Sequence, residues 1–240
     1  MRAIILAAGR GSRMGDLTSQ QPKCRTAFRG KSLIEWQLGA LREAGIEEIA
    51  IVRGYLAHTF DFDVRYFDNP RWQHTNMVMS LMQASSWLQE GPCIVSYSDI
   101  VYSADAVERL MAHSGEIVIS YDPNWRKLWE LRFDDPLSDA ETFKLKGGRV
   151  VEIGQKPKGY EEIEGQYMGL LKFTPYGWAQ VVDFLNSISP ELSDRMDMTS
   201  LLQGLIAREV NLDAVGIADD WYEVDSESDL RRYELMSAPI

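Results

Sequence analysis

Short apolar runs alternate with helical segments over the first 121 residues, and this alternation restricts the fold more than any other feature. Strands are predicted over Arg2–Ala7, Glu48–Arg53, Val64–Phe67, Cys93–Ser96 and Glu116–Tyr121. Helices are predicted between them over Ser32–Ala44, Thr75–Leu88 and Ala104–His113. Ser32 and Glu35 fit a capping box, and Gly45 is placed to end the first helix. Strands joined through helices form βαβ units, so we expect an α/β fold with a mixed, mostly parallel sheet flanked by helices.

The pattern changes between about residues 121 and 173, where glycine and proline separate short strand-like runs. These runs are Leu131–Phe133, Thr142–Leu145, Val150–Ile153 and Tyr167–Phe173. They predict a small antiparallel insertion on the substrate side. Beyond it we expect helices at Tyr176–Asn186, Met198–Arg208 and Glu227–Met236, and strands at Leu212–Ile217 and Trp221–Val224. Because no repeat or linker is evident, residues 1–240 are expected to form a single domain.

Charge and composition exclude several classes of function. The net charge of −11 argues against a partner with a phosphate backbone or an anionic membrane. No run of 18 apolar residues suggests a membrane span, and the short apolar start leads into a glycine loop instead of a signal-peptide cleavage site. Cys24 and Cys93 form no disulfide framework. We therefore expect a reduced cytoplasmic protein that binds neither nucleic acid nor membrane.

The strongest local motif follows the first strand. Residues 6–14 read Leu-Ala-Ala-Gly-Arg-Gly-Ser-Arg-Met. Gly9 and Gly11 permit positive φ and close approach of the backbone to a ligand, and successive N–H groups in such a loop can bind an anion. Arg13 and Lys23 supply positive charge for phosphates. The loop has neither a Walker A ending nor the third glycine of a dinucleotide fingerprint, and an ordinary strand-to-helix turn is the alternative.

Two aspartates stand at strand ends, where α/β sheets bind their ligands. Asp99 follows the strand at Cys93–Ser96, and Asp225 follows Trp221–Val224. Magnesium binds through a few carboxylates together with water and substrate phosphates. The pair therefore predicts a Mg²⁺ site, with helix capping as the alternative, above all for Asp225.

These motifs resemble the sugar-phosphate and choline-phosphate nucleotidyltransferases. The resemblance covers nearly the whole chain, is densest over the first 100 residues, and implies a Rossmann-like nucleotidyltransferase fold with the NTP-binding part at about residues 1–120. By this match Arg13 and Lys23 are catalytic, contacting the triphosphate, while Asp99 and Asp225 hold Mg²⁺. The implied nucleotide-binding residues of the first strand, its loop and the segment before Asp99 are Leu6, Ala7, Ala8, Gly9, Gly11, Ser12 and Ser98.

The segment Asn76-Met-Val-Met-Ser80-Leu resembles the choline-phosphate cytidylyltransferase branch, so CTP is the favoured nucleotide. Asn76 is suited to reading a pyrimidine edge, because an amide both donates and accepts hydrogen bonds. A helix N-cap is the alternative for Asn76. Ser80 lies one turn along the same face and is either a nucleotide ligand or a small packing residue.

Residues of the insertion are candidates for binding the acceptor. Lys156, in Gln155-Lys156-Pro157, resembles the lysine that binds the acceptor phosphate in the wider family, and a solvent-exposed turn lysine is the alternative. The other candidates are Tyr121, Trp125, Trp129, Arg132, Glu164 and Tyr167. Aromatic faces bind cationic amines, but these aromatics equally suit a hydrophobic cluster. Phosphocholine, phosphoethanolamine, 2-aminoethylphosphonate and a phosphorylated amino acid all stay open as acceptors.

Taken together, these features predict a Mg²⁺-dependent cytidylyltransferase that transfers CMP from CTP to a small phosphorylated or phosphonate amine or amino acid. The acceptor oxygen attacks the α-phosphorus in line and pyrophosphate leaves. The alternatives are a sugar-1-phosphate nucleotidyltransferase using UTP or dTTP and a non-catalytic nucleotide-sensing domain. A monomer or homodimer that makes precursors of cell-surface polysaccharide or phospholipid is expected.

Overall fold

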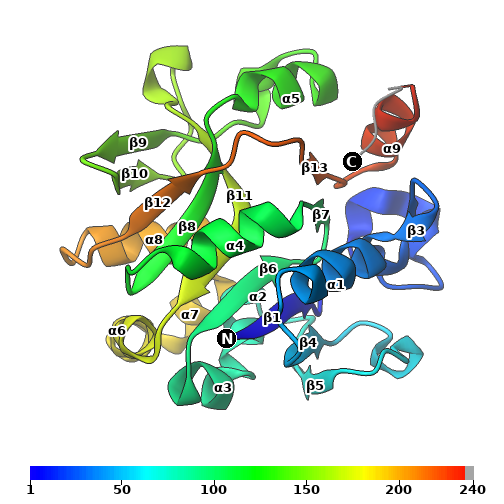
Figure 1. The fold of residues 1–240 in the computed structure, drawn as a ribbon, viewed down its shortest axis with the longest axis horizontal. Coiled ribbons are helices and arrows are strands. Elements are labelled where there is room, and N and C mark those ends of the chain that lie inside the picture. Colours follow the sequence, from blue (N-terminus) through cyan, green and yellow to red (C-terminus); the bar gives the residue numbers. More distant parts are fainter. Residues whose placement is uncertain (236–240) are drawn as a thin grey trace.

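The computed structural model describes residues 1–235, which contain a nine-stranded mixed sheet with helices on both faces (Figure 1). In spatial order the strands are β5 (Arg65–Asp68), β4 (Ile49–Arg53), β1 (Arg2–Ala7), β6 (Cys93–Tyr97), β11 (Gln166–Phe173), β8 (Ile117–Asp122), β12 (Asp213–Gly216), β10 (Arg149–Ile153) and β9 (Phe143–Lys146). The first four strands are parallel to one another, and β12 is parallel to β8. β11 is antiparallel to both of its neighbours. The predicted α/β fold is confirmed.

The helices are α1 (Leu33–Glu43), α2 (Met77–Met82), α3 (Ser85–Glu90), α4 (Ala104–Ala112), α5 (Trp125–Arg132), α6 (Pro175–Asn186), α7 (Pro190–Arg195), α8 (Met198–Ile206) and α9 (Glu227–Glu234). The short strands are β2 (Ala27–Phe28), paired with β3 (Lys31–Ser32), and β7 (Ile100–Val101), paired with β13 (Tyr222–Glu223). The 3₁₀ turns are η1 (Ser12–Thr18), η2 (Lys23–Arg25), η3 (Ala57–Thr59), η4 (Pro136–Ser138) and η5 (Tyr160–Glu162). Within residues 1–235, no helix has the length and apolar character needed to cross a membrane.

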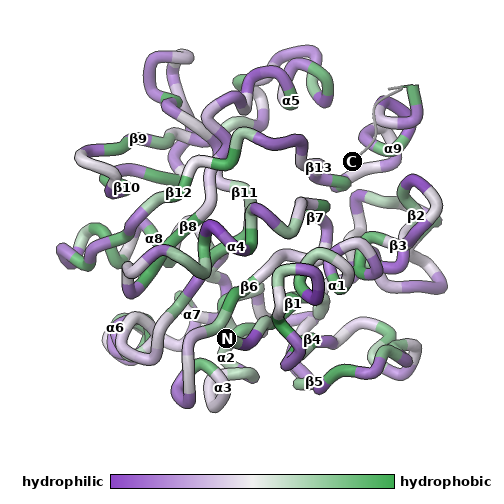
Figure 2. Tube along the Cα trace, viewed as in Figure 1, coloured by the Kyte–Doolittle hydropathy of each residue, from purple (hydrophilic) through white to green (hydrophobic). Residues whose placement is uncertain are grey.

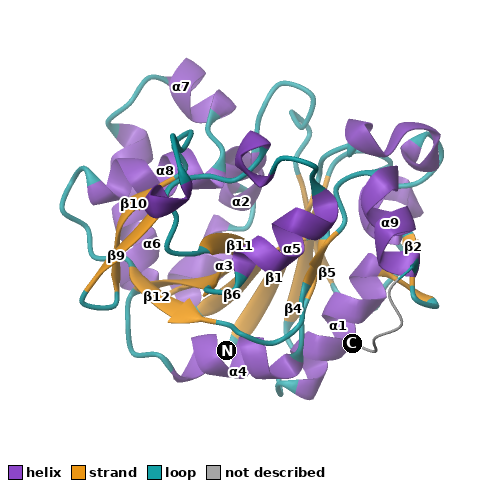
Figure 3. Cartoon of the chain, turned by 90° about the horizontal axis from the view of Figure 1, so that it is seen from above, coloured by secondary structure: helices purple, strands orange, loops and turns teal. Residues whose placement is uncertain are grey.

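Alternate residues of β1 face two separate cores. Ile4 and Leu6 pack under α2, α3, α6 and α8, whereas Ala3 and Ile5 pack under α1 and α4 on the opposite face (Figure 3). Hydrophobic residues are accordingly concentrated along the central strands (Figure 2). Because strand side chains point to the two faces in turn, a strand buried on both faces reads as a continuous apolar run. This rigid centre fixes where the loop after β1 begins.

The predicted start and end of α1 are confirmed. The Glu35 amide donates to Ser32 Oγ (3.4 Å), and the Ser32 amide donates to Glu35 Oε2 (2.7 Å), which completes the capping box. Gly45 has a φ of +82° just after the helix, a conformation that favours glycine. Local sequence signals therefore define this helix at both ends.

Two predicted elements are wrong. The single helix predicted over Thr75–Leu88 is two short helices, α2 and α3, with a turn at residues 83–84. The turn lets Trp87 pack edge-on against Phe67 with ring centroids 5.7 Å apart, a contact that no local pattern reveals. The strand predicted over Leu131–Phe133 is instead the end of helix α5. Its buried residues Trp125 and Trp129 are spaced one helical turn apart.

Other segments differ in their extent. The loop after β1 contains η1, η2 and the hairpin β2–β3, none of which was predicted. Of the antiparallel insertion expected between residues 121 and 173, Thr142–Leu145 and Val150–Ile153 form the hairpin β9–β10 at the edge of the main sheet. Tyr167–Phe173 belongs instead to β11, in the middle of that sheet. Helix α9 ends at Glu234, and Met236, the predicted end of this helix, lies outside the described residues.

Candidate active site

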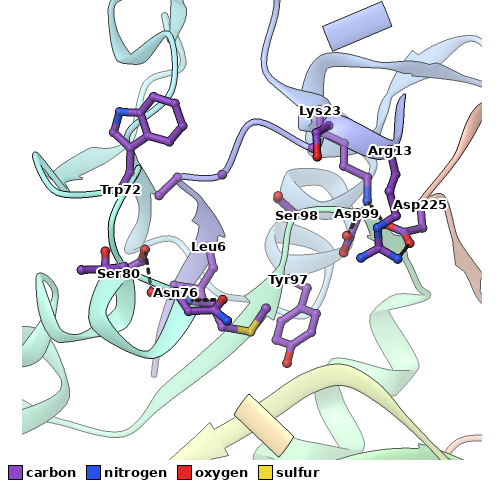
Figure 4. A pocket seen from close by; sticks show the side chains of 16 residues that line it. Leu6, Arg13, Lys23, Trp72, Asn76, Ser80, Tyr97, Ser98, Asp99 and Asp225 are labelled. Carbon is purple, nitrogen blue, oxygen red and sulfur yellow. Dashed lines mark hydrogen bonds and ion pairs between the residues drawn. The ribbon is translucent and has the colours of Figure 1, made fainter. Parts of the chain in front are cut away.

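A cleft of about 340 Å³ lies beyond the carboxyl ends of β1 and β6, where α/β sheets bind ligands (Figure 4). It is formed by the loop after β1, the start of α2, the end of β6 and the segment after β13. Its lining residues are Leu6, Ala8, Gly9, Gly11, Ser12, Arg13, Lys23, Trp72, Thr75, Asn76, Met77, Ser80, Tyr97, Ser98, Asp99 and Asp225. The structure thus brings together all of the predicted nucleotide and metal residues except Ala7, which is buried in the core under α1 and α4.

Gly11 fixes the shape of the loop after β1. Its φ of +70° lies in the left-handed region, and a Cβ atom here would lie 2.6 Å from the Cβ of Lys23. The loop therefore lies directly against the lysine stem, which only glycine allows. Hydrogen bonds to the carbonyl of Gly11 from the Met14 amide (3.0 Å) and Thr18 Oγ1 (3.2 Å) hold the loop in this position.

The two predicted metal ligands are brought together by a short antiparallel pairing. β13 pairs with β7, so that Glu223 lies opposite Ile100. The Val224 amide then donates to the carbonyl oxygen of Asp99 (2.8 Å). This main-chain link places Asp225 beside Asp99 although the two residues are far apart in the sequence.

The ammonium group of Lys23 lies between the two carboxylates. Its Nζ donates to Asp99 Oδ2 (2.7 Å) and Asp225 Oδ1 (2.6 Å), and Arg13 forms an ion pair with the other oxygen of Asp225. Lys23 is only 7% exposed. Burial by itself lowers the pKa of Lys23, but the two carboxylates outweigh it and the pKa lies above its ordinary value. Lys23 is therefore held in its charged form at this end of the cleft, between the carboxylates of Asp99 and Asp225.

The opposite end of the cleft is polar and aromatic. Asn76 Oδ1 accepts from the Met77 amide (2.7 Å), so the N-cap alternative is realised, yet the residue also lines the cleft. Asn69 Nδ2 donates to Ser80 Oγ (3.0 Å). The Ser80 hydroxyl in turn donates to the carbonyl oxygen of Asn76 (3.5 Å). The Trp72 ring forms the wall beside them (Figure 4).

Sequence reasoning did not identify Trp72 or Tyr97 as site residues. Trp72 packs edge-on against Tyr55, with ring centroids 5.4 Å apart. Tyr97, the last residue of β6, lies two residues before Asp99, so its position at a strand end was the one available signal. No local pattern marks Trp72.

The predicted acceptor residues do not line the cleft. Lys156 donates to the carbonyl oxygens of Ser138 (2.8 Å) and Leu137. Trp125, Trp129 and Arg132 are buried, and Tyr121 stacks on Phe143. Glu164 is exposed, and its Oε2 accepts from the Leu145 amide. Tyr167 lies nearest, because its ring packs edge-on against Tyr97 of the cleft with centroids 5.8 Å apart.

With this geometry in place, comparison with known proteins identifies the family. The MobA-like NTP transferase domain matches residues 3–142 of the chain. The chain belongs to this family. It is also similar to a CTP:phosphoglutamine cytidylyltransferase of Campylobacter jejuni subsp. jejuni serotype O:2. The two are 40% identical over 247 residues, which cover 96% of this chain and 98% of that relative.

Solved structures agree on the fold. The CTP:phosphocholine cytidylyltransferase of Streptococcus pneumoniae superposes with a TM-score of 0.72 at 23% identity, covering 97% of both chains. The inositol-1-phosphate CTP transferase of T. maritima superposes with a TM-score of 0.76 at 21% identity, covering 98% of this chain and 94% of that one. The predicted Rossmann-like nucleotidyltransferase fold is confirmed.

Nucleotidyltransferases of this kind generally use a divalent metal, and the carboxylate end of the cleft fits one. Asp99 Oδ1 is buried and has no hydrogen-bond partner among the described residues. A buried oxygen without a partner is costly unless a ligand satisfies it. Residues 1–235 contain no group of three or more His, Cys, Asp or Glu side chains suited to a metal. A hard cation held by two carboxylates would take its other ligands from phosphate and water.

Proposed function

We propose that this nucleotidyltransferase is a Mg²⁺-dependent cytidylyltransferase that transfers CMP from CTP to a phosphorylated amino acid of the phosphoglutamine type, with release of pyrophosphate. The observation that carries the proposal is the 40% identity, over almost the full length of both chains, to a CTP:phosphoglutamine cytidylyltransferase. The arrangement of Lys23 between Asp99 and Asp225 supports it, because it concentrates cation-binding groups at one end of a cleft sized for a nucleotide.

The polar end of the cleft binds the cytosine base. The Ser80 hydroxyl accepts from Asn69 Nδ2 (3.0 Å) and donates only a long bond to the Asn76 carbonyl oxygen (3.5 Å), which an acceptor atom of the base can replace. Asn76 adds an amide beside it, held in place by its cap to α2 and by donation to the Arg195 carbonyl (3.2 Å). Trp72 supplies an aromatic wall for stacking.

The end of the cleft that contains Arg13 and Lys23 binds the triphosphate. An oxygen of the acceptor's phosphoryl group attacks the α-phosphorus of CTP, the bond from that phosphorus to the bridging β-phosphate oxygen breaks, and pyrophosphate leaves. Lys23 and Arg13 neutralise the charge that develops on the leaving group. The attacking oxygen is already anionic, so no general base is required. When bound by Asp99 and Asp225, Mg²⁺ supplies further charge neutralisation at the phosphates.

Lys156 stays a prediction as the ligand of the acceptor phosphate. In this structure its ammonium group bonds the carbonyls of Leu137 and Ser138, and it would have to leave both to reach the cleft. The two free, buried cysteines accord with a reducing compartment, so the proposed site of action is the cytoplasm.

A pyrophosphate-release assay tests the proposal. The purified chain is incubated with Mg²⁺, with each of CTP, UTP, dTTP and ATP, and with phosphoglutamine, phosphocholine, 2-aminoethylphosphonate or glucose-1-phosphate. We expect release to be fastest with CTP and phosphoglutamine. Fastest release with UTP or dTTP and the sugar phosphate would overturn the choice of nucleotide and acceptor, and nucleotide binding without any release would favour a sensing domain.

A further inference from the structure

Arg132, at the end of α5, is a buried cation outside the cleft. It is 4% exposed and its guanidinium group contacts two carboxylates on the C-terminal segment. Its Nε donates to Asp229 Oδ1 (3.1 Å), and its Nη1 forms an ion pair with Glu223. A buried arginine with two acidic partners has a strongly favoured charged state, and removing the arginine leaves two buried carboxylates without their cation.

Asp229 connects this arginine to the backbone of the metal-ligand segment. Its second oxygen, Oδ2, accepts from the amides of Asp225 (3.0 Å) and Ser226 (2.8 Å) and from Ser226 Oγ (2.9 Å). Asp229 is 2% exposed, so these bonds are shielded from water. One carboxylate therefore joins the guanidinium of Arg132 to the main chain at Asp225.

Glu223 attaches the other side of the same segment. It lies two residues before Asp225 in β13, and its carbonyl oxygen accepts from the Tyr233 hydroxyl (2.9 Å) while its side chain pairs with Arg132. The segment between residues 223 and 226 is thus held on both sides of Asp225 by contacts that lead to one arginine. Arg132 itself does not line the cleft.

We propose that Arg132 is a positioning residue of the active site, which holds the carboxylate of Asp225 in register with Asp99 through Glu223 and Asp229. The inference rests on the proposed function only in taking the Asp99–Asp225 end of the cleft as the metal site. Groups that orient metal ligands from behind commonly change metal affinity by about 10- to 100-fold when they are altered. Arg132 therefore acts on the cation site from outside the cleft, through the backbone that carries Asp225.

Metal binding measured without turnover tests the proposal. Mn²⁺ affinity is determined by electron paramagnetic resonance in the presence of a non-hydrolysable CTP analogue, for the wild type, Arg132→Lys and Asp229→Asn. Lysine keeps the charge but loses the fork that reaches two carboxylates. Asparagine can still accept from the Asp225 amide but presents an uncharged group to Arg132. We expect Mn²⁺ affinity to fall about 10-fold or more in both variants.

A control separates positioning from general stability. Trp178, in α6, lies on the opposite face of the sheet from Arg132, and its indole donates to Ser85 Oγ (2.8 Å) in α3. Trp178→Phe removes this buried contact. Unfolding midpoints are measured for all variants. Weakened Mn²⁺ binding in the Arg132 and Asp229 variants but not in Trp178→Phe supports the proposal. Unchanged affinity in either Arg132→Lys or Asp229→Asn, or an equal loss in the control, overturns it. If the wild type binds Mn²⁺ but releases no pyrophosphate, the proposed function fails while this test still stands.

Discussion

The main-chain amide of Val224 donates a 2.8 Å hydrogen bond to the carbonyl oxygen of Asp99. The two proposed metal ligands therefore owe their proximity to backbone pairing between β7 and β13 and not to their own side chains. Changing either carboxylate leaves this link intact. Either carboxylate can accordingly be replaced while the backbone around the cation site keeps its arrangement.

Asp99→Asn and Asp225→Asn should lower turnover by about a thousandfold or more, because each removes a charge that would hold the cation and orient Lys23. The variants should keep the circular dichroism spectrum of the wild type. Asp105→Asn is the matched control, since this carboxylate pairs with Arg109 on α4, away from the cleft. Pyrophosphate release measures the effect, and near-normal rates in either site variant would remove that residue from the mechanism.

Gly11→Ala should weaken both the fold and the reaction. The new Cβ would meet the Lys23 stem at 2.6 Å, on a backbone with positive φ, so the expected loss is about 1–3 kcal/mol of unfolding free energy. Displacement of Lys23 should also lower turnover. Gly9→Ala is the control for stability, because a Cβ there meets no atom within 4 Å. The measurement is urea unfolding of both variants. Equal unfolding midpoints for Gly11→Ala and Gly9→Ala would contradict the close approach of the loop to Lys23.

Much of this site could be predicted from the sequence. Gly11 stands in a glycine loop and Asp99 follows an apolar strand, and such short-range patterns reflect local backbone requirements. Asp225 required the family resemblance, because a helix cap explains its local surroundings equally well. For Gly11 and Asp99, the neighbouring residues in the sequence are enough to indicate the role.

The rest depends on contacts between distant segments. Trp72 can pack against Gly54 only because glycine has no side chain. A Cβ atom at residue 54 would lie 2.6 Å from the Trp72 side chain. Arg132 was assigned to the acceptor because it lies in a stretch of alternating aromatic and basic residues, whereas its partners Glu223 and Asp229 come from the other end of the chain. Ion pairs between residues so far apart cannot be predicted from local patterns in one sequence.

Cys24 and Cys93 should resist alkylation in the folded protein. Burial raises the pKa of each thiol to about 12, and the reactive species is the thiolate. At pH 8 only about one thiol in ten thousand is then ionised. We expect iodoacetamide to modify neither residue in buffer and both in 6 M guanidinium, as measured by intact mass. Rapid native labelling of Cys24 would show that the segment beside Lys23 opens readily.

Glu141 gives the fold a distinct dependence on pH. Burial, reinforced by the neighbouring carboxylates of Asp197 and Asp139, raises the pKa of its side chain to about 7. The folded protein therefore keeps a proton that the unfolded chain releases near its ordinary value of 4.5. Between these two values the folded state binds more protons, so the contribution of Glu141 to stability is present below about pH 4.5 and is lost as the pH rises to 7.

Glu141→Gln should remove this dependence, because the amide stays neutral at every pH. From about pH 5 to pH 8 the wild type should lose on the order of 1–3 kcal/mol of unfolding free energy relative to the variant. Urea titrations at several pH values measure the difference. Parallel stability curves for the two proteins would mean that Glu141 titrates in the folded state as it does in the unfolded chain. A growing advantage of the variant between about pH 5 and pH 7 would instead locate an ionisable group of the folded state at Glu141.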